Sequence, residues 1–150
     1  MAKRGRIVAV CLSPKKGTSK SPVPCGHLRA DFGLEGDAHA GTPGRQVSLL
    51  CLVSIDKMRA KGIELAPGDF AENLTVEGCA AGDFAPGIRI ALQQGPLLEV
   101  TQIGKQCHSG CAIRKLVGDC VMPREGVFAR VVKGGDVSPG DSFEVIADGD

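Results

Sequence analysis

The stretch Ile88-Arg-Ile-Ala-Leu-Gln-Gln-Gly-Pro-Leu-Leu-Glu-Val-Thr-Gln-Ile103 contains two apolar runs, residues 88–92 and 97–103, separated by a turn at Gln94-Gly95-Pro96. Short runs rich in Ile, Leu and Val and bounded by Gly and Pro are typical of β-strands. Similar runs occupy residues 6–12, 45–51, 72–77, 127–132 and 142–146. This recurrence predicts a chain built mainly from short strands.

The segments between these runs carry few helical signals. Ser54 can cap a helix of about two turns that ends before Gly62. Residues 13–44, rich in Gly, Pro, Lys and Asp, resemble a loop. Strands and helices do not alternate, which argues against a doubly wound nucleotide-binding fold. We therefore expect a mainly antiparallel β-barrel or sandwich with one or two short helices.

The composition narrows the classes of function. At 150 residues, the chain predicts a single domain. Its 18 Lys and Arg nearly balance its 17 Asp and Glu, and it has five Phe but no Trp or Tyr, so neither nucleic acid nor a membrane is expected as a partner. The N-terminal apolar stretch is too short for a signal peptide. We expect a cytoplasmic protein with free thiols.

Three of the seven cysteines, Cys107, Cys111 and Cys120, lie in one polar stretch directly after the second run quoted above. Basic neighbours favour the thiolate, which attacks electrophiles and binds soft metals; here they are Lys105, His108, Arg114 and Lys115. From spacing alone, three interpretations stay open: a reactive or cofactor-facing thiol, a structural zinc site that includes His108, and small apolar fillers. Cys11 and Cys51 lie in strand patterns and are expected in the core.

A second group of candidate residues surrounds a glycine-rich segment, residues 31–41. Glycine permits close approach of the backbone to a ligand. Asp37 and His39 alternate, so on an extended segment they would project from one face. His39 and Arg45 could then bind an anionic ligand, with Asp37 orienting the imidazole. The alternative is a tight hairpin in which Asp37 bonds its own turn backbone.

Two further segments carry polar side chains of interest. Three residues carry oxygens that suit Mg²⁺ or Ca²⁺, namely Asp69, Glu72 and Asn73, although a hydrogen-bonded turn explains the same pattern. Arg124 and Arg130 follow the cysteine stretch. Guanidinium groups bind phosphate or carboxylate with two parallel hydrogen bonds. A solvated strand end is the alternative for these two arginines.

Five stretches, taken together, resemble the MOSC domain family, which is named for the C-terminal domain of molybdenum cofactor sulfurases. They are G-L-E-G-D-A-H-A-G with R-Q-V-S-L-L, G-D-F-A-E-N-L-T-V, V-T-Q-I-G-K-Q-C-H, G-V-F-A-R-V-V-K-G-G and V-S-P-G-D, in the family's order. The resemblance implies one domain over residues 1–150 with its core at about 5–147. It also implies a closed antiparallel β-barrel, like the barrel of pyruvate kinase, with one or two short helices.

The same resemblance implies a role in molybdenum cofactor metabolism, either carrying sulfur as a cysteine persulfide or binding the molybdenum cofactor through a thiolate. Cys107 fits the family's cysteine best because it follows Gln102 as Q-x-x-x-x-C. Cys111, followed by Ala and Ile, comes second and Cys120 third, and Cys107 and Cys111 are the expected metal ligands. The residues expected around the cofactor are Gly36, Asp37, His39, Arg45, Asn73, Lys105, Arg124 and Arg130.

The chain is expected to lack the aminotransferase-like domain of the full sulfurase. Sulfur would then come from a separate cysteine desulfurase and pass to the cofactor or to a molybdoenzyme acceptor. Two alternatives stay open: a molybdenum-dependent reductase of N-hydroxylated compounds that works with a redox partner, and a zinc-stapled binding module without catalysis. The sequence leaves open whether the protein is an enzyme, as a sulfur transferase or an oxidoreductase component.

Overall fold

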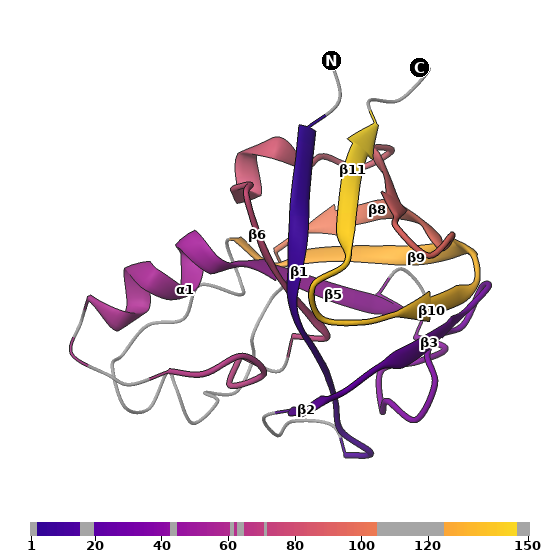
Figure 1. Ribbon diagram of the computed structural model, residues 1–150, viewed down its shortest axis with the longest axis horizontal. Helices are drawn as coiled ribbons and strands as arrows, with labels where there is room; N and C mark the ends of the chain where they lie inside the picture. Colours follow the sequence, from indigo (N-terminus) through magenta and orange to yellow (C-terminus); the bar gives the residue numbers. More distant parts are fainter. Residues whose placement is uncertain are drawn as a thin grey trace.

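The computed structural model describes residues 3–15, 20–42, 45–60, 62, 65–70, 72–104 and 125–146. Its elements are β1 (Lys3–Leu12), β2 (Ser21–Val23), β3 (Gly26–Arg29), β4 (Gly33–Leu34), β5 (Val47–Cys51), α1 (Leu52–Arg59), β6 (Leu74–Glu77), the 3₁₀-helix η1 (Ala81–Asp83), β7 (Arg89–Leu92), β8 (Leu97–Ile103), β9 (Val127–Lys133), β10 (Gly135–Val137) and β11 (Ser142–Ile146). Among these residues, seven strands close into a ring in the order β11-β7-β8-β9-β5-β6-β1, because β1 pairs with β11 as well as with β6 (Figure 1). The predicted β-barrel is confirmed.

Neighbouring strands of the described barrel run antiparallel at every pair except β5 and β6. These two are parallel, with Leu49 opposite Leu74 and Cys51 opposite Val76. The barrel is therefore mainly antiparallel, as the sequence predicts, and the antiparallel barrel implied by the resemblance is corrected at this one pair. Parallel neighbours need a crossover connection, and here α1 lies between the two strands in the chain and supplies part of it.

The ring closes where β1 lies between β11 and β6. Gly5 is opposite Phe143 of β11. A Cβ atom at this position would collide with the Phe143 ring and with the carbonyl oxygen of Glu77, so glycine permits the close approach of the three strands. The start of β1 and the end of β11 consequently lie side by side at one end of the barrel (Figure 1).

The barrel interior is apolar. Alternate residues along each strand face inward, as the period of two in a strand requires. The buried cluster includes Ile7, Val10, Val47, Leu49, Leu74, Val76, Ile90, Leu98, Val100, Val127, Ala129, Val131 and Phe143. Cys51 and Cys79 belong to the same cluster, and Cys11 is also fully buried. The prediction that Cys11 and Cys51 are core residues is confirmed.

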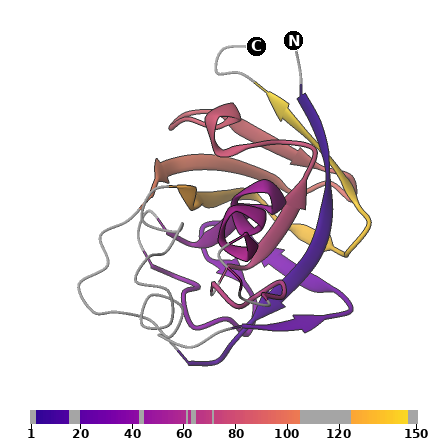
Figure 2. The same cartoon turned by 90° about the vertical axis from the view of Figure 1, so that its left-hand side faces the viewer.

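A second apolar cluster lies outside the barrel wall, against α1, which stands in front of the strands in Figure 2. It contains Leu50, Ile55, Met58, Leu65, Phe70 and Phe128. Leu50 and Phe128 alternate with interior residues of β5 and β9, so they face outward and meet the helix. The outer face of this part of the barrel is therefore covered.

The helix starts earlier than the sequence indicates. α1 begins at Leu52, and Cys51 occupies the N-cap position without a side-chain capping bond. The expectation that Ser54 caps the helix is wrong, because its hydroxyl is buried and donates to Glu125 Oε1 at 2.7 Å.

Within the described ranges, no helix has the length and apolar character needed to cross a bilayer.

The segment 13–44 contains three short strands, although its sequence resembles a loop. β2 pairs with β1, while β3 pairs with β4 and with β10 in a separate small sheet. Strands this short, three, four and two residues long, show no readable alternation of apolar and polar side chains. The prediction of a loop is therefore wrong for β2, β3 and β4. These strands hold the intervening turns against the barrel.

Candidate functional site: a buried polar cluster

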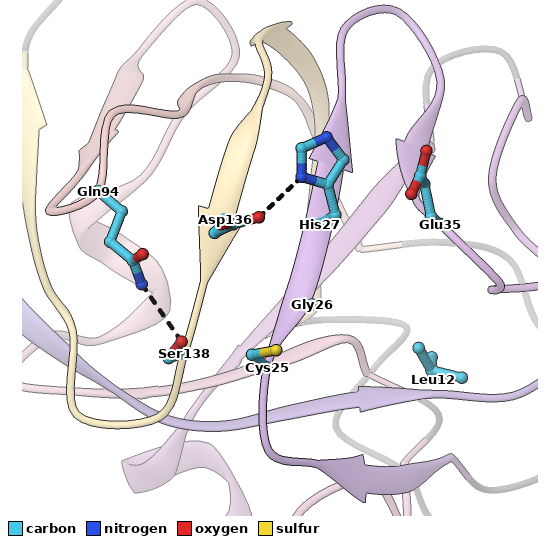
Figure 3. Close-up of a pocket in the computed structure, with 8 residues that line it drawn as sticks. All are labelled: Leu12, Cys25, Gly26, His27, Glu35, Gln94, Asp136 and Ser138. Carbon is cyan, nitrogen blue, oxygen red and sulfur yellow. Dashed lines mark hydrogen bonds and ion pairs between the residues drawn. The ribbon is translucent and has the colours of Figure 1, made fainter.

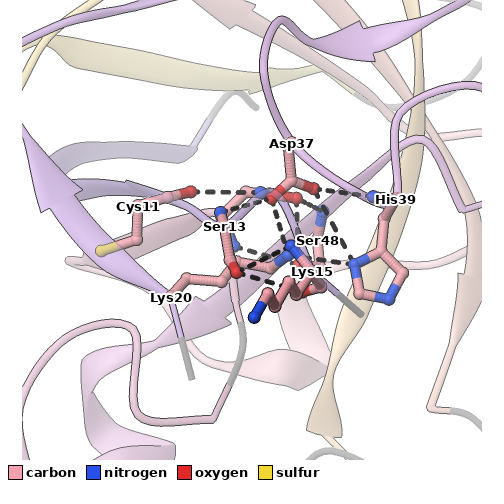
Figure 4. Close-up of polar contacts among 8 residues, drawn as sticks. Cys11, Ser13, Lys15, Lys20, Asp37, His39 and Ser48 are labelled. Atoms are coloured by element: carbon pink, nitrogen blue, oxygen red, sulfur yellow. Dashed lines mark hydrogen bonds and ion pairs between the residues drawn. The ribbon is translucent and has the colours of Figure 1, made fainter. Parts of the chain in front are cut away.

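A buried ion pair lies where the segments carrying Lys20 and Asp37 meet (Figure 4). Lys20 Nζ donates to Asp37 Oδ1 at 2.7 Å, and both side chains are 0% exposed. The backbone N–H of Ser13 donates to the same oxygen at 3.0 Å. Burial by itself raises the pKa of the Asp37 carboxyl, but the hydrogen bonds from Lys20 and Ser13 outweigh it and hold that pKa below its usual value. The carboxyl is therefore ionised at neutral pH.

His39 extends the ion pair toward the surface. Its Nδ1 lies 3.0 Å from Lys20 Nζ and 3.8 Å from Asp37 Oδ2. An ammonium group has donors only, so Nδ1 accepts and the ring proton of the neutral imidazole lies on Nε2. The side chain is 30% exposed, and Nε2 points away from the ion pair (Figure 4). The imidazole is thus the part of this group that is accessible to solvent.

Asn73 connects the ion pair to three strands of the barrel. Its Oδ1 accepts from the backbone N–H and the hydroxyl of Ser48, at 3.0 and 3.3 Å. Its Nδ2 donates to the carbonyl oxygen of Cys11 at 3.1 Å, and its side-chain amide helps to lower the pKa of Asp37. Asn73 therefore links β1 and β5 to the start of β6 beside the ion pair.

A second buried carboxylate, Glu72, lies beside this cluster. It accepts hydrogen bonds from the backbone N–H groups of Gly68 and Phe70, at 3.0 and 3.2 Å, and from the hydroxyl of Thr75 at 2.6 Å. Burial raises the pKa of the Glu72 carboxyl. Burial, with the nearby Glu72 carboxylate, also raises the pKa of the Cys11 thiol to about 12. Cys11 is therefore protonated at neutral pH and unsuited to nucleophilic attack.

Both interpretations of the glycine-rich segment, a turn bonded by Asp37 and an Asp37 carboxylate that orients the imidazole, apply in the structure. Asp37 bonds its own turn, because the backbone N–H of His39 donates to Asp37 Oδ2 at 3.1 Å, and it also approaches the imidazole. Gly36 precedes them with a φ of 86°, a left-handed backbone that favours glycine. Of the predicted site residues, the structure brings Gly36, Asp37, His39 and Asn73 together.

The two predicted arginines that the structure describes, Arg45 and Arg130, have different surroundings. Arg45 is exposed and follows the glycine-rich turn in the chain. Arg130, on β9, donates from Nε to Glu99 at 2.9 Å and lies 3.5 Å from Asp31 through Nη1. The guanidinium of Arg130 is thus paired with carboxylates, whereas Arg45 is exposed to solvent.

The predicted cysteines lie outside the described residues, together with two of the predicted cations: Cys107, Cys111, Cys120, Lys105 and Arg124. The residues that flank this segment are joined by hydrogen bonds. The backbone N–H of Gly104 donates to the carbonyl oxygen of Gly126 at 2.7 Å, and Gln102 Nε2 donates to the carbonyl oxygen of Gly104 at 2.9 Å. The chain thus leaves β8 and returns toward β9 at one place on the barrel, next to the Ser54–Glu125 contact with α1.

A separate open pocket of about 400 Å³ lies beside the small sheet (Figure 3). Its lining is Leu12, Cys25, Gly26, His27, Glu35, Gln94, Asp136 and Ser138. His27 Nδ1 lies 2.8 Å from Asp136 Oδ1, and both side chains are largely exposed. In the described part of the chain, no group of three or more His, Cys, Asp or Glu side chains is arranged to hold a metal ion.

The sequence does not point to two members of the polar cluster, Lys20 and Ser48. Lys20 lies in a Lys- and Gly-rich stretch that is typical of a solvated loop, and its partner is 17 positions away. Ser48 offers a weak signal, because it is a polar residue inside the apolar run Val47–Cys51. Such a residue is buried only when its hydroxyl and backbone have partners.

Comparison with known proteins gives one family match and several similar solved structures. The family model described as the MOSC domain matches residues 36–144. The crystal structure of the YuaD protein from Bacillus subtilis superposes with a TM-score of 0.81 at 17% identity, covering 97% of this chain and 97% of that chain. YiiM from Geobacillus stearothermophilus gives 0.73 at 21% identity over 95% of this chain and 75% of that chain. YiiM from Escherichia coli gives 0.66 at 20% identity, with coverages of 96% and 70%. No curated protein matches the chain significantly.

Proposed function

The chain belongs to the MOSC domain family, and from this membership we propose that it acts in molybdenum cofactor metabolism through a cysteine thiolate. It either carries sulfur as a persulfide or binds the molybdenum cofactor. Cys107 is the first candidate for the thiol, followed by Cys111 and then Cys120. A separate desulfurase supplies the sulfur in the carrier role, and the cofactor or a molybdoenzyme accepts it.

The observation that carries the proposal is the Lys20–Asp37 ion pair, which is 0% exposed and in contact with a half-buried imidazole. Removing two charges from water costs several kcal/mol for each ion. A protein in which apolar side chains of similar volume replace such a pair is often as stable or more stable. A buried pair that touches an accessible titratable group is therefore typical of a functional site. Asp37 and His39 lie within residues 36–144, which the family model matches, whereas Lys20 precedes that range by 16 positions.

His39 and Arg45 suit the anionic part of a ligand. His39 Nδ1 faces Lys20 Nζ, so the donor of its neutral ring is Nε2, which points away from Lys20. Arg45 adds an exposed guanidinium a few positions later in the chain. A phosphate group needs such donors and cations. Arg130 fits this role less well, because it would first have to give up its bond to Glu99.

The position of the end of β8, which precedes the cysteine segment in the sequence, also supports the proposal. Gln102 is opposite Phe128, and Phe128 is opposite Ser48, so the end of β8 is two strands from the Ser48–Asn73 contact. Neighbouring strands are about 5 Å apart, which places that end roughly 10 Å from the polar cluster. Cys107 follows Gly104 by three positions in the sequence.

The described residues fit the anionic part of the molybdenum cofactor, and the cysteines provide the soft ligand that its metal prefers. His39 and Arg45 would hold the anionic group, Asp37 and Lys20 would position His39, and Cys107 or Cys111 would supply the thiolate. When bound, the cofactor would contribute a metal centre that exchanges sulfur or oxygen. In the persulfide role, the same donors would keep the cysteine segment and its acceptor in place.

The proposal is tested on protein purified without oxygen. Bound molybdenum together with pterin fluorescence is expected if the protein binds the cofactor, and sulfur released by cyanide is expected if it carries a persulfide. Cys107→Ser, Cys111→Ser and the double variant are then compared with Cys25→Ser, the matched control in the separate pocket. We expect loss in a Cys107 or Cys111 variant and retention in the control.

Three outcomes would count against the proposal. Retention of molybdenum or labile sulfur in the double variant would move the role to another thiol, with Cys120 next in order. One zinc ion per chain and neither molybdenum nor labile sulfur would favour the zinc-stapled module. Reduction of an N-hydroxylated compound by the molybdenum-loaded protein with a redox partner would favour the reductase alternative.

A further inference from the structure

Cys51 and Cys79 form a pair of thiols that the proposed function does not use. Their Sγ atoms lie 3.5 Å apart within the apolar cluster of the barrel interior. Cys51 is 0% exposed and Cys79 is 6% exposed. They are 28 positions apart in the chain, so their contact is a product of the tertiary fold.

The backbone around β6 brings the two thiols together. Cys51 is the last residue of β5 and lies opposite Val76 on the parallel neighbour β6. Gly78 then turns the chain with a φ of 87°. A Cβ atom at Gly78 would lie 3.1 Å from the Cα of Gly5, so both the φ and the space require glycine. This turn directs Cys79 back over the end of β5.

We propose that Cys51 and Cys79 are the site of a reversible intramolecular disulfide. Disulfide sulfurs are about 2 Å apart, so each sulfur has to move by less than ~1 Å from its present position. Both side chains already face each other, and the movement lies within the range of small side-chain rotations. The inference does not depend on the proposed function, because neither thiol belongs to the cysteine segment or the polar cluster.

The two thiols have different reactivities. The hydrogen bond between the two thiols lowers the pKa of Cys79, while the same contact and burial raise the pKa of Cys51. The thiolate is the attacking species, so Cys79 is the nucleophile. Cys79 is also the less buried of the two. Cys51 is then the thiol that resolves the intermediate.

The oxidant is a peroxide, small enough to reach a thiol that is nearly buried. The Cys79 thiolate attacks one oxygen of hydrogen peroxide, the O–O bond breaks, and hydroxide leaves while a sulfenic acid forms. The Cys51 sulfur attacks the sulfenic sulfur, the S–S bond forms, the S–O bond breaks, and the Cys51 proton leaves with the hydroxide as water. Two electrons pass from the thiols to the peroxide, and a dithiol reductant returns them.

The disulfide would join the N-cap residue of α1 to the turn after β6. Closing a chain segment of this length stabilises the folded state mainly by restricting the unfolded chain. For a domain of this size, we expect the melting temperature of the oxidised protein to rise by roughly 10 °C. Reduction should remove the increase.

Tryptic mapping tests the proposal on the wild-type protein, because each thiol falls on its own peptide. Cleavage after Arg45, Lys57, Lys61 and Arg89 gives peptide 46–57 with Cys51 alone and peptide 62–89 with Cys79 alone. The folded protein is treated with hydrogen peroxide, its free thiols are alkylated, and it is digested without reduction. We expect one product with the mass of both peptides minus two hydrogens, which a dithiol separates.

Variants show which thiol acts first. Cys79→Ser should abolish the product and leave Cys51 alkylated, whereas Cys51→Ser should stop the reaction at the sulfenic acid of Cys79. Cys25→Ser, an exposed thiol in the other pocket, should leave the product unchanged. The proposal is overturned if both peptides stay separate while Cys25 is oxidised, or if Cys51 is oxidised equally in the Cys79→Ser variant.

Discussion

The barrel interior and the polar cluster outside it are both shielded from water, yet they are held together differently. The interior is filled by aliphatic side chains whose burial is favourable in proportion to their area and largely independent of their exact partners. Lys20, Asp37, Glu72 and Asn73 are equally buried but depend on specific donors and acceptors. In the described part of the chain, no buried side-chain nitrogen or oxygen lacks a partner. The interior therefore stabilises the fold through its total apolar area, whereas the stability of the cluster depends on every one of its hydrogen-bond partners.

Asp37→Asn should have the largest effect, because it leaves the Lys20 ammonium buried without an opposite charge. Breaking one partner of a buried pair costs about 3–5 kcal/mol of the free energy of unfolding. Urea unfolding of both proteins at pH 7 measures the difference. A cost below about 1 kcal/mol would show that the pair is hydrated in solution, and the contrast with the interior would fail.

The double variant Lys20→Met/Asp37→Leu is the control for that measurement. It removes both charges and fills the space with hydrocarbon, so the cluster becomes more like the interior. Replacing a buried pair in this way is often neutral or stabilising. We therefore expect the double variant to be more stable than Asp37→Asn alone.

Gly68→Ala should have the next largest effect, and Gly62→Ala is its matched control. Both glycines have a left-handed backbone, with φ of 92° and 93°. A Cβ atom at Gly68 would collide with the carbonyl oxygen of Lys20, whereas one at Gly62 meets no described atom within 4 Å. The shared backbone strain costs roughly 1–2 kcal/mol, and the collision should add about 1–3 kcal/mol at Gly68. Thermal unfolding of the two variants measures this difference, and equal costs would contradict it.

The pH dependence of stability should separate the two carboxyl groups of the outer wall. Burial raises the pKa of Asp37, but the hydrogen bonds from Lys20 and Ser13 lower that pKa by more, so the folded pKa lies below the unfolded value of about 4. The ionised Asp37 therefore contributes its full stabilisation above the unfolded pKa. This stabilisation is lost as the pH falls through the folded pKa. The stability gap between wild type and Asp37→Asn should therefore narrow from pH 7 to pH 3. Burial raises the pKa of Glu72, so its ionisation costs stability as the pH rises, and Glu72→Gln should show the opposite trend. A gap that widens toward acid pH for Asp37→Asn would contradict this assignment.

Glu99→Gln should have the smallest effect. Glu99 accepts from Arg130 at 2.9 Å, close to the Lys20–Asp37 distance, but the two side chains are 25% and 37% exposed. Exposed pairs contribute about 0–1 kcal/mol, so urea unfolding should show a loss of less than about 1 kcal/mol. A loss as large as that of Asp37→Asn would mean that burial does not distinguish the two pairs.

Much of the barrel could be predicted from the sequence, because its strands carry their own patterns. The runs at 97–103 and 142–146 match β8 and β11 residue for residue, and the run at 127–132 matches β9 to within one residue. The parallel pairing of β5 and β6 was not predictable in the same way, since a strand's composition does not record the direction of its neighbour.

Three of five residues of the polar cluster could be predicted and two could not. Asp37, His39 and Asn73 lie in glycine-rich or turn-forming segments, where polar side chains are recognisable as candidates for hydrogen bonding or ligand binding. Lys20 and Ser48 do not, because their roles come from residues 17 and 25 positions away. The Cys51–Cys79 contact is of the same kind, with no signal in the spacing of the two cysteines.

The amino-acid sequence alone determined the β-class of this protein, most strand limits and the family, because these depend on local patterns of apolar residues and on short motifs. Only the tertiary structure decided which charges are buried together, that Arg130 is paired with Glu99, and that two distant thiols touch. These features depend on how the strands wrap into a ring. Closure brings together side chains whose separation along the chain carries no information about their separation in space.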